Sequence, residues 1–221
     1  MKPYKVLCTD KDPNWLQLRH EHLTASDVAA LLGESPWKTR EQLLAEKSSP
    51  LPGEWKDTRN MWHGRFNEDH NRKKFSHITG IRSRGAHAML ASSLLTPLAC
   101  TLDAIAIPPK EWPQIVPVAV QTPSWISKVV QQVMDAGGMG LLEMKQTEAW
   151  YGKEWKKGPP MHYWIQVQTQ LFVTQFEWAI LCCQIGAADM IAYFMRREPV
   201  FADELERAMK EYNEELSAQA A

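Results

Sequence analysis

The chain has 221 residues, of which 44% are hydrophobic and 23% charged, so it is long enough for one globular domain with elaborations. A formal net charge of −1 weighs against a protein held on nucleic acid by overall charge, although a local positive groove can coexist with an acidic exterior. The four cysteines show no C-x-x-C spacing, which argues against a zinc site. The most apolar stretch, 178–185, is too short to span a bilayer and is predicted to be a buried strand.

Helices are predicted for most of the N-terminal part. The expected ranges are 12–19, 27–32, 39–47 and about 60–78. Asp12 followed by Pro13 predicts the first helix start, because proline is favoured at the first helical position. Ser26 is expected to cap the second helix, which stops at Gly33, and Gly80 is expected to end the fourth.

Strands and helices alternate over the remainder of the chain. Strands are expected at 87–91, 98–107, 141–145, 178–186 and 190–197, and helices at 124–134, 162–175 and 199–216. Residues 108–137 begin with several prolines and are interpreted as an insertion within a single domain that spans 1–221. Residues 150–160 are expected to form a loop. This order predicts a mixed α/β fold, with a central sheet and helices on both of its faces.

Two carboxylates and a lysine come from apolar segments of the predicted sheet. Asp103 closes the apolar run 98–102, and Glu143 and Lys145 flank Met144. Because side chains at i and i+2 of a strand point to one face, Glu143 and Lys145 would project together while Met144 turns to the core. Such charges are costly on a buried strand unless they are paired or bound to metal. The set is typical of a metal-dependent phosphodiesterase; the alternatives are a surface ion pair and, for Asp103, a cap at a strand end.

Four segments span most of the chain in a fixed order. They are Leu18-Arg19 with Leu23-Thr24-Ala25-Ser26-Asp27-Val28; Trp62-His63-Gly64-Arg65-Phe66-Asn67-Glu68-Asp69; Ala99-Cys100-Thr101-Leu102-Asp103; and Leu142-Glu143-Met144-Lys145 with Ile165-Gln166-Val167-Gln168. In these segments the sequence resembles the phage lambda exonuclease type of the YqaJ-like viral recombinases, a branch of the PD-(D/E)XK nuclease superfamily. The resemblance implies a restriction-endonuclease-like core, which is a mixed central sheet flanked by helices.

The sequence departs from the family pattern at three points. Leu102 stands where the family name has proline, and Ala104 stands where the family often has glycine. The gap from Asp103 to Glu143 is also long, in keeping with the predicted insertion. None of these departures removes a residue that is expected to bind metal.

The resemblance implies a Mg²⁺-dependent site, with Mn²⁺ as a substitute and two ions in each active site. Asp103, Glu143 and the backbone carbonyl of Met144 would be the metal ligands, which suits a hard cation that prefers oxygen. Lys145 would orient the attacking water, accept its proton or offset charge in the transition state. Glu68 would add another acidic catalytic group; its alternative is an ordinary salt bridge to the arginine four residues later on the same helix.

The resemblance also implies contacts with a DNA end. A pocket for the 5′-terminal phosphate would comprise Arg19, Ser26, Thr101, Gln166 and Gln168. Arginine offers a bidentate fork for phosphate, and hydroxyl and amide groups complete such a pocket. Met61 falls where the family places an apolar wedge that separates the strands. The alternatives are an N-cap for Ser26, glutamines bonded to neighbouring backbone, and a packing role for Met61 at the helix start.

With the resemblance, the sequence predicts a Mg²⁺-dependent exonuclease that degrades the 5′-ended strand of linear double-stranded DNA to mononucleotides and leaves 3′ single-stranded tails. The family assembles as a homotrimeric ring, and its tails feed a phage single-strand annealing protein in the cytoplasm of the bacterial host. No membrane partner is expected. The alternatives are a restriction-like or repair endonuclease on the same core, and a DNA-binding or assembly protein with a degenerate site. An end pocket argues against the first, and the complete set of acids argues against the second.

Overall fold

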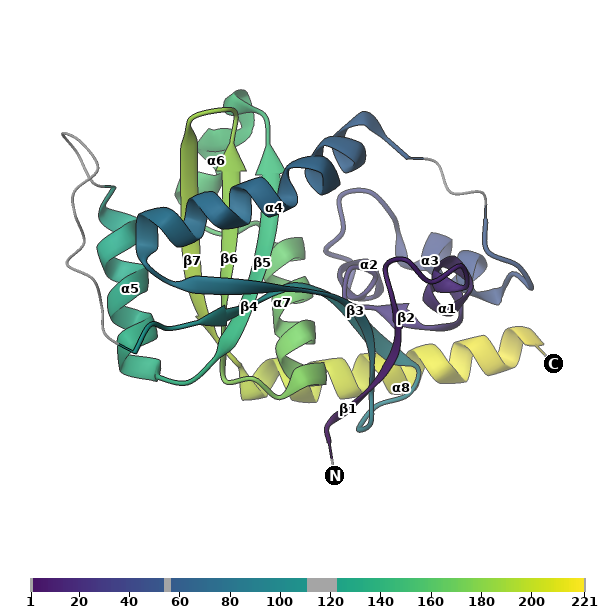
Figure 1. Cartoon of the computed structure of the whole chain (residues 1–221). Helices are drawn as coiled ribbons and strands as arrows, with labels where there is room; N and C mark the ends of the chain where they lie inside the picture. The colour runs from purple at the N-terminus through teal and green to yellow at the C-terminus, as the bar shows by residue number, and fades with distance from the viewer. Residues whose placement is uncertain (1, 54–56, 111–122, 221) are drawn as a thin grey trace.

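A central mixed sheet organises the protein (Figure 1), whose computed structural model describes residues 2–53, 57–110 and 123–220. Within these residues the sheet has seven strands in the order β1-β3-β4-β5-β6-β7, with β2 beside β4. The strands are β1 (Tyr4–Thr9), β2 (Leu23–Thr24), β3 (Arg82–Ser92), β4 (Leu98–Ile107), β5 (Gly140–Thr147), β6 (Trp178–Ile185) and β7 (Asp189–Arg196). The β2·β4 and β5·β6 pairs are parallel and the others antiparallel, so the predicted mixed sheet is confirmed.

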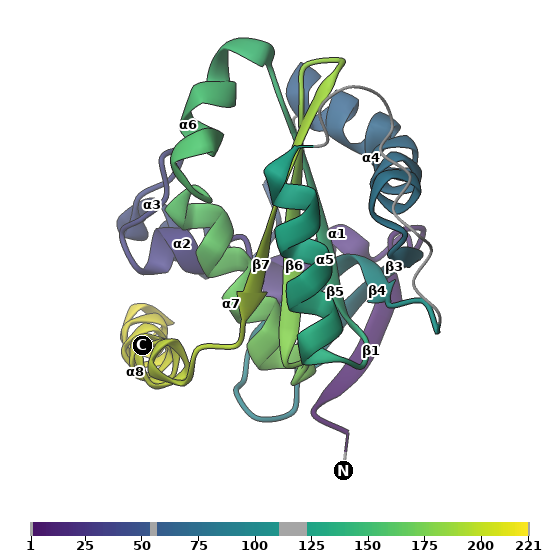
Figure 2. The same ribbon diagram turned by 90° about the vertical axis from the view of Figure 1, so that its left-hand side faces the viewer.

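Helices cover both faces of the sheet, as Figure 2 shows. They are α1 (Trp15–Glu21), α2 (Val28–Leu31), α3 (Arg40–Ser48), α4 (Arg59–Thr79), α5 (Ser124–Ala136), α6 (Gly152–Lys157), α7 (Met161–Thr174) and α8 (Pro199–Ala220), with a 3-10 turn η1 at Ala149–Tyr151. One core lies between the sheet and α4 and α5, and the other lies between the sheet and α2, α3, α7 and α8. No helix in the described ranges is both long and apolar enough to cross a membrane.

The central strands are apolar throughout because both of their faces are covered. Every residue of β6 is buried: Ile180 and Cys182 face the core under α4 and α5, whereas Leu181 and Cys183 face the core under α7. The apolar stretch 178–185 is therefore a buried strand, as the sequence predicts.

The ends of α4 also agree with the sequence. The Thr58 hydroxyl accepts a hydrogen bond from the Met61 N–H at the start of the helix. Gly80 closes the helix in the left-handed conformation, with φ of 73°, which glycine adopts without a Cβ penalty. This 21-residue helix carries both Met61 and Glu68 across the sheet.

Two predicted helix starts were wrong. Asp27, not Ser26, is the N-cap of α2, and the Ser26 hydroxyl is engaged by other side chains. The first helix begins at Trp15 rather than at Asp12. The Asp12 carboxylate accepts a hydrogen bond from the Asn14 N–H and holds a turn ahead of the helix, which is the local competition that aspartate commonly offers.

Three other features were absent from the sequence prediction or lie partly outside the described residues. The strands β1 and β2 were missed; β1 pairs with β3 and β2 with β4. Residues 150–160, expected to form a loop, contain part of η1 and the helix α6. Of the predicted insertion at 108–137, residues 111–122 lie outside the described residues, and α5 packs on the sheet from its far end.

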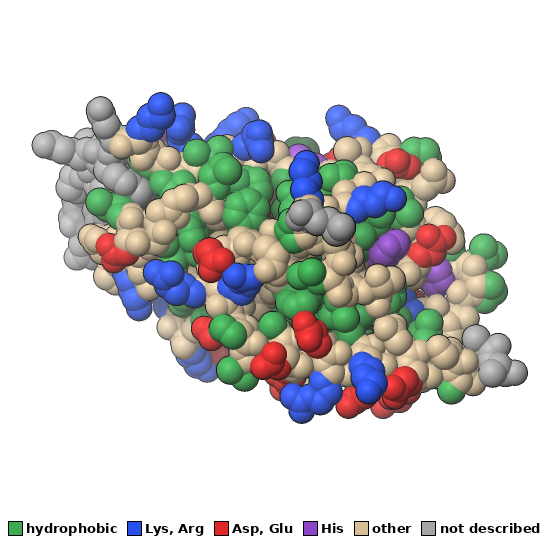
Figure 3. Space-filling view, turned by 90° about the horizontal axis from the view of Figure 1, so that it is seen from below, with side chains coloured by type: hydrophobic (Ala, Val, Ile, Leu, Met, Phe, Trp, Pro, Cys, Tyr) green, Lys and Arg blue, Asp and Glu red, His purple; other side chains and the backbone are tan. Residues whose placement is uncertain are grey.

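The face on which α8 lies carries acidic and basic side chains intermixed with hydrophobic ones (Figure 3). Charges of both signs occur along this helix, as Glu206, Arg207, Lys210 and Glu211 illustrate. This mixture agrees with the formal net charge of −1 and does not resemble the one-sign field that long-range attraction of DNA requires.

The packing of Gly140 against Trp178 provides a test of the fold. A Cβ at Gly140 would lie 2.2 Å from Cε3 of the buried Trp178 ring, whose indole N–H donates to the Gly137 carbonyl. We expect Gly140→Ala to lower the free energy of unfolding by about 1–3 kcal/mol, the range for an overpacked core, in thermal or denaturant unfolding. Gly64→Ala, in open space within α4, should instead raise it by about 0.5–1 kcal/mol. Equal stability of the two variants would contradict this packing.

Candidate active site

The site lies where β4 and β5 part. Their pairing runs from Ala106 opposite Gly140 to Ala104 opposite Leu142, and it ends there. Asp103 is the next residue of β4, and its Oδ2 accepts a hydrogen bond from the Met144 N–H at 2.8 Å. The Asp103 carboxylate therefore occupies a position that a strand partner would otherwise fill. An extended residue directs its N–H and C=O to the same edge of its strand, so the Met144 carbonyl lies on the edge that faces Asp103.

A β-bulge in β3 lies opposite Asp103. The register of β3 against β4 slips between Gly85 and Ala88, which pair with Ala104 and Leu102 respectively. Leu102 packs in the core under α7, whereas Ala104 packs in the core under α4 and α5, although residues two apart in a regular strand share one face. Bulges next to functional sites commonly re-aim a side chain in this way. The sequence signal was Gly85 inside a strand pattern.

Glu143 is buried, at 2% exposure, and both of its carboxylate oxygens are paired. Oε1 accepts from Lys145 Nζ at 2.7 Å and from Gln166 Nε2 at 2.6 Å, and Oε2 accepts from Gln170 Nε2 at 2.7 Å. A buried carboxylate needs such partners, because an unpaired one is strongly destabilising. The two glutamines are four residues apart and share one face of α7. Sequence reasoning missed Gln170, which this spacing could have revealed.

Negative charge exceeds positive charge at this site. Burial, and then the neighbouring Glu143 and Glu68, raise the pKa of the Asp103 carboxyl well above its usual value. Burial is also the largest cause of the raised pKa of Glu68. Burial alone would lower the pKa of the Lys145 ammonium, but Glu143 and Asp103 outweigh it and leave that pKa raised. Lys145 is therefore held as an ammonium.

Glu68 reaches the site from α4. Its Oε1 lies 3.9 Å from Nδ1 of His87, a residue of the β3 bulge with φ of 42° that sequence reasoning did not anticipate. Arg72 donates to the Ser83 carbonyl at 2.9 Å and pairs with Asp69, and no ion pair joins it to Glu68 among the described residues. The salt bridge considered as the alternative role of Glu68 is thus not formed.

The donors at the parting of the strands fit a hard divalent cation. Asp103, Glu143 and Glu68 are three acids close enough to influence one another, with Lys145 as the neighbouring cation, so a bound cation would relieve their repulsion. In the described part of the chain, no three His, Cys, Asp or Glu side chains converge as metal ligands. An ion here would accordingly be completed by the Met144 carbonyl and by water, as Mg²⁺ commonly is.

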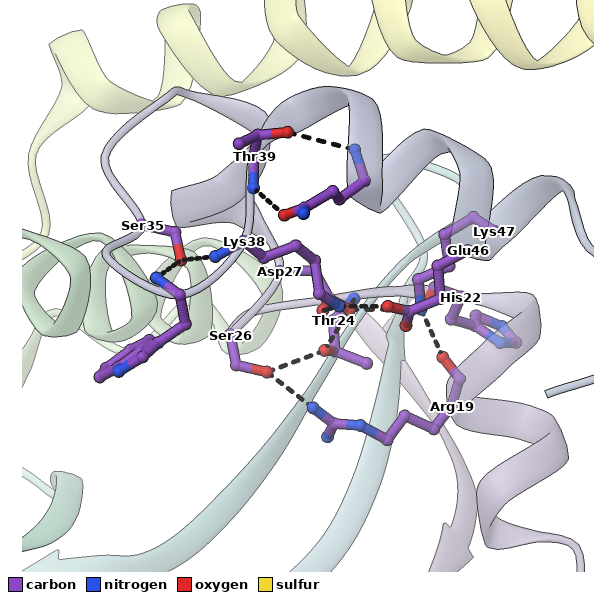
Figure 4. A network of polar contacts seen from close by, with 12 residues as sticks. Arg19, His22, Thr24, Ser26, Asp27, Ser35, Lys38, Thr39, Glu46 and Lys47 are labelled. Carbon is purple, nitrogen blue, oxygen red and sulfur yellow. Dashed lines mark hydrogen bonds and ion pairs between the residues drawn. The ribbon is translucent and has the colours of Figure 1, made fainter. Parts of the chain in front are cut away.

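A second polar cluster joins Arg19 to Ser26 (Figure 4). Arg19 Nη2 donates to Ser26 Oγ at 2.8 Å, and the Thr24 hydroxyl donates to Asp27 at 2.7 Å. Because the single Thr24 hydroxyl proton goes to Asp27, Ser26 donates to Thr24 across their 3.1 Å contact and accepts from Arg19. Lys47 Nζ lies 3.3 Å from Asp27 Oδ2, and both side chains are nearly inaccessible. A buried ion pair thus orients the arginine and the serine that the sequence assigned together.

The remaining predicted residues fall in different places. Thr101 lies at the site, where its carbonyl accepts from Gln170 at 3.0 Å. Gln168 is not brought to the site: its amide donates to the Arg196 carbonyl and accepts from the Glu198 N–H. Met61 is 38% exposed near the start of α4, seven residues before Glu68 and so on the same side of the helix.

Comparison with known proteins adds to this geometry. A family model described as the YqaJ-like viral recombinase domain matches residues 14–177. A search of proteins with curated functions finds no significant match. The fold resembles that of LHK-Exo, an alkaline exonuclease from Laribacter hongkongensis, with a TM-score of 0.71 and 19% identity over 94% of both chains.

Two further structures are similar. LHK-Exo in complex with dAMP has a TM-score of 0.71 and 17% identity over 94% of both chains. A phage related exonuclease from Haemophilus somnus 129PT has a TM-score of 0.52 and 11% identity over 93% of this chain and 99% of that one. At such low identities, these likenesses show a shared fold.

The buried Asp27–Lys47 pair predicts a pH-dependent stability. Burial by itself raises the pKa of the Asp27 carboxyl, but Lys47, Arg19 and the Thr24 hydrogen bond outweigh it and leave the pKa lowered. The stability from this pair is present above the unfolded-state pKa of about 3.9 and is lost as the pH falls through the lower folded-state pKa. We expect Asp27→Asn to cost roughly 3–5 kcal/mol at pH 7 in denaturant unfolding, because it leaves Lys47 unpaired.

The matched control is Glu46→Gln, which removes an exposed partner of Lys38 and should cost at most about 1 kcal/mol. The stability difference between the unmodified protein and Asp27→Asn should shrink as the pH is lowered below about 4. A constant difference from pH 7 to pH 3 would contradict the role assigned to Asp27.

Proposed function

Because the chain belongs to the YqaJ-like viral recombinase family, we propose that it is a metal-dependent exonuclease that degrades the 5′-ended strand of linear double-stranded DNA. The reaction would release mononucleotides and leave 3′ single-stranded tails for phage recombination by strand annealing. The single observation that carries the proposal is the set of acids at the parting of β4 and β5. There Asp103 and Glu143 lie with Lys145 and Glu68 in one buried site.

The acids and the lysine divide the chemistry between them. Asp103, Glu143 and the Met144 carbonyl would hold Mg²⁺ or Mn²⁺, which when bound polarises the scissile phosphate and lowers the pKa of a water molecule. Gln166 and Glu143 are joined by a hydrogen bond that fixes the carboxylate before substrate arrives. Lys145, held as an ammonium, is suited to stabilising the charge that develops on the phosphate in the transition state. Two ions in each site remain part of the proposal.

Arg19 and Ser26 support an end-directed activity. Both would contact the 5′-terminal phosphate, with Thr101 and Gln166 nearer the acids. The relative LHK-Exo was solved in complex with dAMP, which is a product expected of digestion to mononucleotides. An endonuclease has no need for a pocket of this kind, so the exonuclease is the better proposal.

Assembly and partners follow from the family. We propose a homotrimeric ring around DNA, which would retain its substrate by topology rather than by the net charge of −1. The 3′ tails would pass to a phage single-strand annealing protein in the cytoplasm of the bacterial host.

Removal of either acid should abolish cleavage. We expect Asp103→Asn and Glu143→Gln to reduce the release of nucleotides from linear duplex in Mg²⁺ by at least about 10²–10³-fold, the loss typical of one transition-state-stabilising group. DNA binding measured without metal should persist. The exposed acid Glu154, on α6, offers the control Glu154→Gln, which should digest at the normal rate. Near-normal turnover by either site variant would refute the assignment.

Arg19 should confer a preference for phosphorylated ends. A charge-assisted hydrogen bond of about 1.5–3 kcal/mol corresponds to about 10- to 150-fold faster digestion of 5′-phosphate than of 5′-hydroxyl ends. Arg19→Ala should erase this preference, and Arg19→Lys, which keeps the charge but loses the fork, should restore only part of it. The measurement is the initial rate on duplexes that differ in the 5′ group alone. Equal rates on both ends for the unmodified protein would rule out the pocket.

Met61 is proposed to separate the strands. Unpairing a terminal base costs a few kcal/mol, so Met61→Ala should slow digestion of blunt duplex and recover on ends already frayed by mismatches. The comparably exposed Met134 on α5 supplies a control, since Met134→Ala should behave normally on both substrates. If Met61 only packs the helix start, its variant would instead unfold at a lower temperature and be equally slow on both. Unmodified rates on blunt duplex would also exclude a wedge.

A further inference from the structure

Trp37 is an exposed aromatic side chain on a loop with a fixed backbone. The loop lies between α2 and α3, and the Trp37 ring is 70% exposed. The backbone N–H groups of Trp37 and Lys38 both donate to the Ser35 hydroxyl, each at 3.3 Å. Large aromatic side chains are usually buried, so this one is presented to solvent by an ordered turn.

On one side Trp37 reaches the lysine of the active site through two rings of α7. Its ring lies edge-on to His162 with centroids 4.5 Å apart, and 6.0 Å from Tyr163. The ammonium of Lys145 lies 4.9 Å from the centroid of the Tyr163 ring. Burial and the nearby Lys145 lower the pKa of His162 to about 4, so His162 is neutral at pH 7 and supports the indole as an apolar wall.

On its other side the same loop is tied to the cluster of Arg19 and Ser26. Lys38 Nζ lies 3.9 Å from Asp27 Oδ1, and Asp27 accepts the Thr24 hydroxyl that contacts Ser26. Figure 4 shows Lys38 and Ser35 on the loop beside this cluster. Trp37 therefore belongs to a segment that connects the proposed phosphate pocket with the acids and Lys145.

We propose that Trp37 is the platform on which the base of the 5′-terminal nucleotide stacks. This inference rests on the proposed function and deepens it. A nucleotide whose 5′-phosphate is held by Arg19 and Ser26, and whose 3′-phosphodiester lies at Asp103 and Glu143, spans the two sites that this loop connects. Its base then meets the exposed indole. Stacking of this kind tolerates every base, because each presents a π-face, and so it suits an enzyme that digests any sequence.

Trp150 supplies a matched comparison. It is also 70% exposed, and it stacks on Tyr151 with ring centroids 3.8 Å apart. It lies in η1, and none of the interactions of the described residues links it to the acids or to the Arg19 cluster. A general effect of removing an exposed indole would therefore appear in both variants, whereas an effect of stacking at the DNA end would appear only at Trp37.

The test compares two 5′-phosphorylated duplexes, one with an intact terminal nucleotide and one whose terminal nucleotide lacks its base. We expect Trp37→Ala to lower kcat/KM on the intact end by about 5- to 150-fold, the range for one base–aromatic stack. The unmodified enzyme should lose a similar factor when the base is absent, and Trp37→Ala should lose nothing further. Trp37→Phe should retain most of the activity, and Trp150→Ala all of it. Thermal unfolding of each variant checks that the fold is intact.

Two results would overturn the stacking platform while leaving the exonuclease in place. One is equal digestion of intact and abasic ends by the unmodified enzyme, and the other is an equal loss on both ends in Trp37→Ala. If the unmodified protein digests no linear duplex in Mg²⁺, the proposed function fails, and binding of 5′-phosphorylated oligonucleotides without metal decides the stacking separately. Tighter binding of the intact than of the abasic oligonucleotide, lost in Trp37→Ala, supports the platform; equal binding overturns it.

Discussion

Buried negative charge at the parting of β4 and β5 is the constraint on which the rest of the structure depends. Glu143 and Glu68 raise the pKa of Asp103 beyond what burial alone does, and burying such groups is costly unless each has a partner. The parting of the strands makes partners available, because the Met144 N–H turns to Asp103 instead of to a neighbouring strand. The β3 bulge and the glutamine face of α7 complete this arrangement.

The helix α7 relates the acids to the N-terminal segment. On one stretch it carries Gln166 and Gln170, which hold Glu143, and near its start it carries the rings that contact Trp37. The helix α2 packs against it, so the Arg19 cluster is positioned relative to the acids by the apolar core between these helices. A buried Asp27–Lys47 pair gives that cluster a single arrangement, because breaking it would strand a charge away from water.

Much of the fold could be predicted because its signals are local. Hydrophobic runs bounded by turn residues placed β4, β6 and β7, and a threonine cap with a left-handed glycine placed α4 within a residue or two. The strands β1 and β2 escaped because their pairing, not their composition, makes them strands. Ser26 was misassigned as a cap for the same reason: its partner, Arg19, comes from a different helix.

The sequence by itself determined the chemistry of the candidate site, because alternation along β5 places Glu143 and Lys145 on one face and the spacing to Asp103 matches a family pattern. Only the tertiary structure decided which glutamines reach that site. Gln170 bonds to Glu143, while Gln168, two residues away, faces the backbone of β7. Helical periodicity divides such residues between two faces, but nothing in it says which face meets the acids. That choice belongs to the packing of α7 on the sheet, which buries one face against the parting strands.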